Sequence, residues 1–205
     1  MTRKSALGLM VVTLTLFSTQ ACTPVSAVMG AGAGAGIAAY QERGIDGVAR
    51  DLKTATHILD LFARSDHKLL KDISVEVYEG RVLLTGQTKK PVIRAEAVRL
   101  AWAAEGTKDV LNEIHVTLEG GILDTARDAW ITTQLQAKLT FDKKVYALNY
   151  AIETVGGTVY LIGVAQNQQE LDRVKNQARS ISYVQHIVSH VRIKKQTPTT
   201  AGGGQ

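Results

Sequence analysis

Hydrophobic residues along the chain follow two periods, one typical of helices and one typical of strands, and their order predicts the elements. A helix-spaced stripe lies between residues 52 and 62, and alternation over residues 73–77 predicts a strand. Glu79-Gly80 predicts a hairpin turn into a second strand, and Pro91 suits the first turn of another helix. The apolar positions are Leu52, Ala55, Ile58, Leu59 and Phe62, then Ile73, Val75 and Val77, then Val82, Leu83 and Leu84, then Ala97, Leu100, Ala101 and Ala104, and finally Val110, Ile114 and Val116.

The same order of elements occurs again 77 residues further along the chain. The segment Gly80-Arg-Val-Leu-Leu-Thr-Gly86 is matched by Gly157-Thr-Val-Tyr-Leu-Ile-Gly163, and the offset continues without a gap. A repeat of this length predicts one small domain used twice, because it is too long for a solenoid unit. The apolar positions of the second copy are Ile131, Leu135 and Leu139, then Ile152, Val159, Tyr160 and Leu161, then Val174, Ala178 and Ile181, and finally Ile187, Val191 and Ile193.

Each copy is therefore predicted to contain a helix, two strands, a helix and a strand. A hairpin joins antiparallel strands, whereas a strand–helix–strand crossover favours a parallel pair. The expected fold is α+β, with two tandem small αββαβ sandwiches, each a three-stranded mixed sheet with two helices on one face. We assign the copies to residues 46–119 and 124–195, and the short link between them favours contact between the domains.

The N-terminal segment has the pattern of an export signal. A basic start and an apolar run over residues 5–17, too short to span a bilayer, predict a signal peptide over residues 1–21. Cys22 is the only cysteine and the predicted lipidation site, because the segment resembles a bacterial lipoprotein signal. Thr19 departs from that pattern, since Leu or Val is usual there. An ordinary secretory signal followed by an incidental cysteine is the alternative.

Two further segments lack the residues needed for a core. Residues 22–45 contain a Gly/Ala run and are expected to form a lipidated flexible tether. Residues 196–205 are polar and rich in Gly and Thr, and are expected to form a disordered tail.

Charge is unevenly divided between the two copies. Residues 46–120 hold 11 basic and 12 acidic side chains, a net −1, whereas residues 124–195 hold 10 basic and 6 acidic side chains, a net +4. The second copy is therefore the one expected to attract an anionic partner.

The αββαβ unit with its G-x-V-x-L-x-G hairpin resembles the BON domain (bacterial OsmY and nodulation). Two such domains behind a lipoprotein signal resemble the dual BON-domain outer-membrane lipoproteins, and the most specific matching segment is Asp128-Ala-Trp-Ile-Thr-Thr-Gln-Leu135. The resemblance covers roughly residues 46–194. It implies a non-enzymatic protein, lipid-anchored in the outer membrane and facing the periplasm. It also implies that the second domain binds anionic phospholipid and that the protein supports envelope integrity.

The outward face of the first helix differs most between the copies. Its inward residues Ile131, Leu135 and Leu139 must face the sheet. The outward positions read Trp130, Gln134, Ala137 and Phe141 in the second copy and Lys53, His57, Asp60 and Arg64 in the first. An interfacial aromatic residue flanked by lysines suits an anionic membrane. The predicted phospholipid-binding residues are Trp130, Gln134, Lys138, Phe141, Lys143 and Lys144.

A second interpretation stays open for these residues. Trp130 would instead pack between the domains as interdomain core, and the protein would be a periplasmic module that binds peptidoglycan or another protein. Phe141 is placed less firmly, since it lies near the expected helix end and could pack under the sheet.

The sequence offers little for catalysis or for a cofactor. His186 and His190 are four residues apart, but in a strand they would lie about 13 Å from each other, too far to share a metal ion. There is no activated serine motif, and Cys22 is assigned to lipid attachment. We therefore expect no enzymatic activity, no cofactor and no metal. Export argues against nucleic-acid binding, which leaves an anionic phospholipid membrane and envelope proteins as partners.

Overall fold

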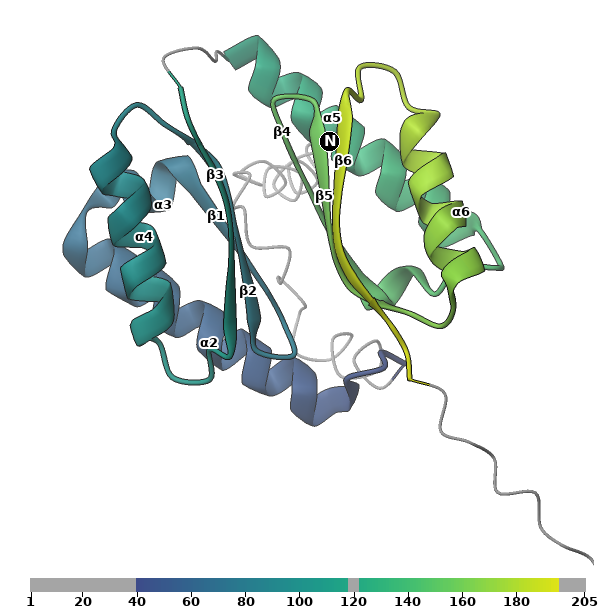
Figure 1. Ribbon diagram of the computed structural model, residues 1–205, viewed down its shortest axis with the longest axis horizontal. Coiled ribbons are helices and arrows are strands. Elements are labelled where there is room, and N and C mark those ends of the chain that lie inside the picture. The colour runs from purple at the N-terminus through teal and green to yellow at the C-terminus, as the bar shows by residue number, and fades with distance from the viewer. Residues whose placement is uncertain (1–39, 118–121, 196–205) are drawn as a thin grey trace, which may run out of the picture.

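The computed structural model describes residues 40–117 and 122–195, and it contains two small α+β domains side by side (Figure 1). The predicted signal peptide over residues 1–21, Cys22, most of the tether and the predicted tail over residues 196–205 lie outside this range. Within the described residues, no helix combines the length and the apolar character that crossing a bilayer requires.

Domain 1 has the predicted order of elements and one additional short helix. Strand β1 pairs antiparallel with β2, and β2 pairs parallel with β3, so the sheet is mixed as expected. The additional helix, α3, precedes β1, and Asp66 caps it by accepting a hydrogen bond from the backbone N–H of Lys68. The elements are α2 (Gly44–Ser65), α3 (His67–Asp72), β1 (Ile73–Tyr78), β2 (Arg81–Thr88), α4 (Pro91–Ala103) and β3 (Asp109–Val116).

Domain 2 repeats this topology. Strand β4 is antiparallel to β5, β5 is parallel to β6, and the pairing of Thr154 with Val159 repeats that of Val77 with Val82 at the same offset. The predicted duplication and the mixed sheets are thus confirmed. The elements are α5 (Ile122–Phe141), η1 (Ala147–Asn149), β4 (Tyr150–Val155), β5 (Thr158–Ala165), α6 (Gln168–Arg179) and β6 (His186–Ile193).

The helices of each domain cover one face of its sheet, and the domain's own core lies between them. Ile58 and Phe62 of α2 are fully buried there, as are Ile131 and Leu135 of α5. Leu52 was predicted to belong to the stripe of α2, but 47% of its surface is exposed. The prediction was wrong because the turn of the helix that contains Leu52 presents Asp51, not Leu52, to the interior.

Asp51 is buried because its carboxylate holds the hairpin turn of domain 1. It accepts hydrogen bonds from the backbone N–H groups of Glu79 and Gly80, at 2.7 and 2.8 Å. Asp128 of α5 does the same in domain 2 and accepts from Gly156 and Gly157 at 2.6 and 2.8 Å. In both domains, an aspartate therefore fixes the first helix to the β-hairpin.

The second glycine of each hairpin motif lies where two backbones approach closely. Gly86 and Gly163 have φ values of +129° and +149°, which residues with a side chain rarely adopt. A Cβ atom on Gly163 would lie 1.9 Å from the carbonyl oxygen of Asn149, and one on Gly86 would lie 2.1 Å from that of Asp72. The second glycine therefore lets the second hairpin strand, β2 or β5, lie close to the residues that lead into the first hairpin strand, β1 or β4.

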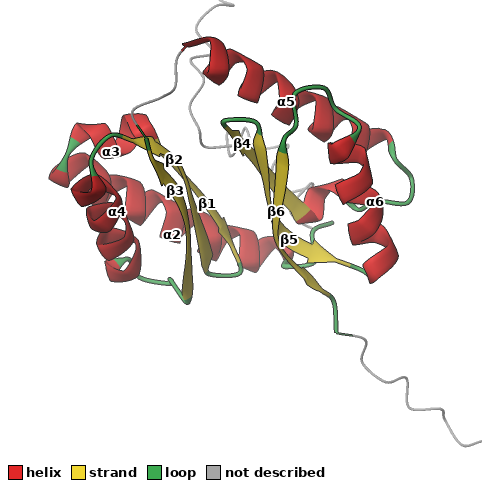
Figure 2. Ribbon diagram, turned by 45° about the horizontal axis from the view of Figure 1, so that its top comes forward, coloured by secondary structure: helices red, strands yellow, loops and turns green. Residues whose placement is uncertain are grey.

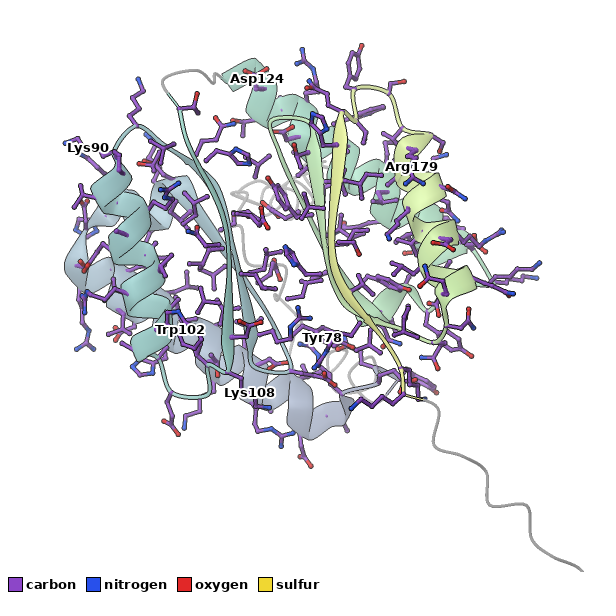
Figure 3. All side chains as sticks on the ribbon, viewed as in Figure 1. Tyr78, Lys90, Trp102, Lys108, Asp124 and Arg179 are labelled. Carbon is purple, nitrogen blue, oxygen red and sulfur yellow. The ribbon has the colours of Figure 1, made fainter. Side chains whose placement is uncertain are left out.

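The remaining faces of the two sheets pack against each other, so the molecule has four layers with the helices outermost (Figure 2). The apolar contact between the sheets consists of Tyr78 and Leu83 from domain 1 with Tyr160, Ile162 and Val164 from domain 2. Tyr78 lies in this layer (Figure 3). Every residue of β5 is buried, because one face of the strand meets α5 and α6 and the other meets domain 1. We call this sheet-to-sheet contact the joint.

Glu42 and Arg43, just before α2, hold the two domains together at one end. The backbone N–H of Glu42 donates to Oδ1 of Asn149 (2.9 Å), and its carboxylate pairs with Lys194 at the end of β6 (2.9 Å). Arg43 forms an ion pair with Asp51 in domain 1 (2.6 Å). The segment that was assigned to the tether, residues 22–45, therefore includes two residues that bridge the domains, and its last two residues already belong to α2.

Candidate functional site

Helix α5 presents two chemically different faces, as its sequence predicted. Ile131, Leu135 and Leu139 are buried against the sheet of domain 2. On the outward side, 43% of Trp130 and 85% of Phe141 are exposed to solvent. A folded domain that leaves two large aromatic side chains on one exposed helix face presents a surface suited to a partner.

Trp130 packs on its own domain and stays accessible. Its ring meets the ring of Tyr183 edge to face, with centroids 6.2 Å apart and an interplanar angle of 72°. The guanidinium of Arg127, one turn earlier on α5, lies 5.1 Å from the centroid of the Tyr183 ring. We call these three residues the aromatic cluster. The alternative that placed Trp130 in the interdomain core is wrong, since the side chains buried between the sheets are those of the joint and Trp130 is exposed.

Tyr183 is held in an unusual backbone conformation. Its φ is +69°, in the left-handed region that glycine adopts readily and a bulky residue rarely does. The equivalent position in domain 1 is Gly106, with a φ of +92°. Domain 2 thus carries an exposed aromatic ring where domain 1 has none, at a cost of about 1–3 kcal/mol in backbone strain. Such strain at an exposed residue is typical of a functional position.

A second group of exposed residues lies where α5 ends. Phe141 is followed by Lys143 and Lys144, both exposed, and by Tyr146 and Leu148, which are 62% and 44% exposed. The backbone N–H of Tyr146 is fixed by a 2.9 Å hydrogen bond to the carboxylate of Glu170 on α6. These five residues, here called the C-terminal cluster, combine apolar rings with positive charge.

The one acidic residue within this segment is neutralised by α6. The Asp142 carboxylate contacts the side chains of Arg173 and Gln177, and accepts the backbone N–H of Lys144 at 3.0 Å. The hydrogen bond from Arg173 lowers the pKa of Asp142 below its ordinary value, so the carboxylate stays ionised and paired. The lysines beside it therefore determine the local charge.

The predicted residues form a line along the helix and do not converge on one pocket. Trp130 and Phe141 are eleven positions apart, which corresponds to about 16 Å along the axis. Lys138 lies between them and donates to Oγ of Ser180 at 3.3 Å. Gln134 is half-buried. The structure thus places the predicted residues on one elongated surface, with the aromatic cluster near one end and the C-terminal cluster at the other.

Helix α2 shows how different the equivalent face is in domain 1. Lys53 pairs with Glu105 at 3.0 Å, and Arg64 pairs with Asp60 at 2.9 Å. In contrast, among the described residues no ion pair involves Lys138, Lys143 or Lys144. The excess positive charge of domain 2 is therefore available on the same side as its exposed rings.

Four members of the two clusters were missed from the sequence: Arg127, Tyr183, Tyr146 and Leu148. The same offset that aligned the copies places Tyr183 opposite Gly106, so that comparison could have identified it. Tyr146 and Leu148 gave no such signal, because the loop and η1 that carry them correspond to the regular helix α3 in domain 1. Their exposure follows from that local difference.

A cavity of about 490 Å³ opens between the domains beside the aromatic cluster. Its lining includes Arg127, but also the carboxylates of Asp124 and Asp128. Both oxygens of Asp128 accept backbone hydrogen bonds, and Asp124 pairs with Arg127 at 3.2 Å. The cavity therefore offers an anion little uncompensated positive charge, and the exposed face of α5 is the better candidate for an anionic partner.

The histidines do not form a metal site in the described part of the chain. No group of three or more His, Cys, Asp or Glu side chains lies close enough there to hold a metal ion. His190 instead contacts Glu113 of domain 1, with Nε2 and Oε1 2.8 Å apart.

Comparison with known proteins gives a consistent result for both halves of the chain. The family model of the BON domain matches residues 50–117 and 127–195. An uncharacterised protein of Anaplasma centrale is 40% identical over 62% of this chain and 85% of its own length. The outer membrane lipoprotein DolP of Haemophilus influenzae is 29% identical over 80% of this chain and 85% of its own length. The osmotically inducible protein Y of Escherichia coli is 31% identical over 63% and 66%.

Proposed function

The chain belongs to the BON-domain family, and on that premise we propose that it is a non-enzymatic outer-membrane lipoprotein that binds anionic phospholipid through its second domain. Its similarity to an outer membrane lipoprotein supports the location. Cys22 would carry the lipid, residues 22–39 would link it to the domains, and the domains would face the periplasm. Domain 1 would act as a spacer or as a platform for an envelope protein, and the whole would support envelope integrity.

The exposed face of α5 is the observation that carries this proposal. Burial of apolar surface contributes about 25 cal/mol per Å², so the exposed parts of Trp130 and Phe141 would together contribute roughly 5 kcal/mol at an interface. Lys138, Lys143 and Lys144 would each add on the order of 1 kcal/mol near an anionic surface. This face would act as a second membrane signal beside the lipid on Cys22.

Co-sedimentation with liposomes tests the proposal directly. The chain carrying Cys22→Ser, which removes the acyl group, should pellet with phosphatidylglycerol liposomes and much less with phosphatidylcholine liposomes. Trp130→Glu should reduce the bound fraction at least tenfold. Added salt should weaken binding, because the lysine contribution is screened.

Trp102→Glu is the matched control. Trp102 is 53% exposed on α4, on the side of domain 1 that faces away from domain 2 (Figure 3). The same substitution there should leave liposome binding unchanged. Equal losses for the two variants, or no preference for anionic lipid, would rule out the proposed surface. Pelleting with insoluble peptidoglycan in place of liposomes would establish the rival function.

A further inference from the structure

The joint is crossed by hydrogen bonds between polar side chains of the two domains. Nε2 of His115 and the hydroxyl of Tyr160 lie 2.5 Å apart, and the hydroxyl of Ser74 donates to the carboxylate of Glu153 at 3.1 Å. The carboxylate of Glu113 lies 2.8 Å from Nε2 of His190. Apolar side chains bury the joint, and these three polar contacts cross it from one domain to the other.

Glu113 and His190 occupy a special position in the joint. They are equivalent residues of the two domains, at the repeat offset of 77. When two copies of a domain pack about a two-fold axis, only residues on that axis meet their own counterparts. The strand contacts between the domains fit such an axis. β1 of domain 1 contacts β5 of domain 2, and their equivalents, β4 of domain 2 and β2 of domain 1, also contact each other. If the two domains had the same residue at this position, two carboxylates or two imidazoles would meet on the axis. In this chain the carboxylate of Glu113 meets the imidazole of His190 instead.

Glu153 is the proton-binding group of the joint that burial affects most. It lies on the β4 face that is turned to domain 1, and its carboxylate accepts a hydrogen bond from the neutral Ser74 hydroxyl. Burial raises the pKa of Glu153 to about 7, the hydrogen bond from Ser74 opposes that rise, and the charge of Asp128 adds to it. A protonated Glu153 is therefore favoured while the sheets remain in contact.

We propose that the joint takes up protons as it closes, so that the two domains are held together more firmly in mild acid than at alkaline pH. Glu153 is the group that gives the joint this dependence. Protonation of Glu153 removes a buried charge that only opening of the joint could hydrate.

Several other charged groups lie near the joint. Arg81 donates to the backbone carbonyl of His190 at 2.7 Å and lies 3.8 Å from Asp109. Arg192 pairs with Glu79 across the end of the joint. Glu76, equivalent to Glu153 in domain 1, lies on the corresponding face of β1 and also has an interaction partner. The contacts of the two arginines add to the joint, and none of them involves the Glu153 carboxylate.

The sign and size follow from linkage between proton binding and opening. The Glu153 carboxyl keeps its proton up to about pH 7 in the closed joint but loses it near its ordinary value of 4.5 once exposed. Below about pH 4.5, Glu153 is protonated in both the closed and the open joint, so it does not favour opening. As the pH rises from there to about 7, Glu153 increasingly favours the open joint, and the closed joint loses stability. From pH 5.5 to 8, the equilibrium constant for opening should increase roughly 30-fold.

Thiol accessibility on the two faces of β5 can measure opening of the joint separately from unfolding. Ile162 faces the joint, whereas its neighbour Leu161 faces the core of domain 2, and both are fully buried. In the full chain carrying Cys22→Ser, Ile162→Cys and Leu161→Cys would be modified with a thiol reagent at pH 5.5 and 8, with rates corrected for thiolate content. Opening of the joint exposes only position 162, whereas unfolding of domain 2 exposes both.

The expected result is that the corrected rate for Ile162→Cys rises at least tenfold from pH 5.5 to 8, while that for Leu161→Cys stays nearly constant. Adding Glu153→Gln should remove most of this rise, and the matched control Glu105→Gln, at an exposed carboxylate of domain 1, should leave it intact. Equal rises at both positions, no rise at position 162, or a rise that survives Glu153→Gln would each overturn the proposal. The test involves no lipid, so it is independent of the proposed membrane binding.

Discussion

Replacing Gly163 by alanine should destabilise domain 2 more than any change in its exposed loops. The new Cβ atom would lie 1.9 Å from the carbonyl oxygen of Asn149, and backbone cannot move aside as a flexible side chain can. The backbone conformation itself, with φ of +149°, adds a cost of about 1–3 kcal/mol for a residue with a side chain. Overpacking typically costs a further 1–3 kcal/mol, so we expect a loss of roughly 2–6 kcal/mol in the free energy of unfolding.

Urea denaturation followed by tryptophan fluorescence would measure this loss. In a Trp102→Phe background, the signal comes from Trp130 and therefore reports on domain 2. Gly156→Ala is the matched control within domain 2, since Gly156 has φ of +58° and its added Cβ would meet only the end of the flexible Gln87 side chain, at 3.1 Å. It should show only the conformational cost, about 1–2 kcal/mol. A loss below 1 kcal/mol for Gly163→Ala, or equal losses for the two variants, would refute the argument from close approach.

The remaining predictions concern the buried aspartates and the stripe of α2. Asp51→Ala should cost about 2–4 kcal/mol, because it removes two backbone hydrogen bonds and leaves the Arg43 guanidinium without its partner. Asp128→Ala removes two hydrogen bonds and no comparable ion pair, so about 1–2 kcal/mol is expected, and urea denaturation would show whether this order holds. Ile58→Ala should cost about 2–5 kcal/mol by leaving a cavity, whereas Leu52→Ala, at an exposed site, should change stability by less than 1 kcal/mol. Comparable shifts of Tm for these last two variants would mean that Leu52 is buried after all.

The duplicated fold could be predicted because its signals are local. The hairpin glycines, the alternation before Gly80 and Gly157, and the apolar spacing of α5 each depend on a few neighbouring residues. The burial of Asp51 could not be predicted in this way, because it depends on a hairpin turn 28 residues away. From the sequence alone, a charged residue at the edge of an amphipathic helix is expected to be exposed to solvent. Its burial can be recognised only when its hydrogen-bond partners are known.

The sequence of β5 indicated the joint, but the apolar residues of this strand were interpreted only as part of a hairpin. Residues 159–164 of β5 are nearly continuous in apolar character, which is typical of a strand buried on both faces. On β2, Thr85, Gln87 and Thr88 end the apolar run after Leu84, so domain 1 gave no matching indication. The residues of the candidate site could likewise be predicted only where the signal was local. Trp130 stood out because a single position changed from charged to aromatic, whereas Tyr146 depends on where a loop happens to run.

The bridge made by Glu42 and Arg43 has a mechanical consequence. Any pull on the chain from its N-terminal side enters the folded part at these two residues. Glu42 passes load to domain 2 through Asn149 and Lys194, and Arg43 passes load to domain 1 through Asp51. The pulling force is thereby divided between the two domains where the chain enters them, so the two domains would move together as one body.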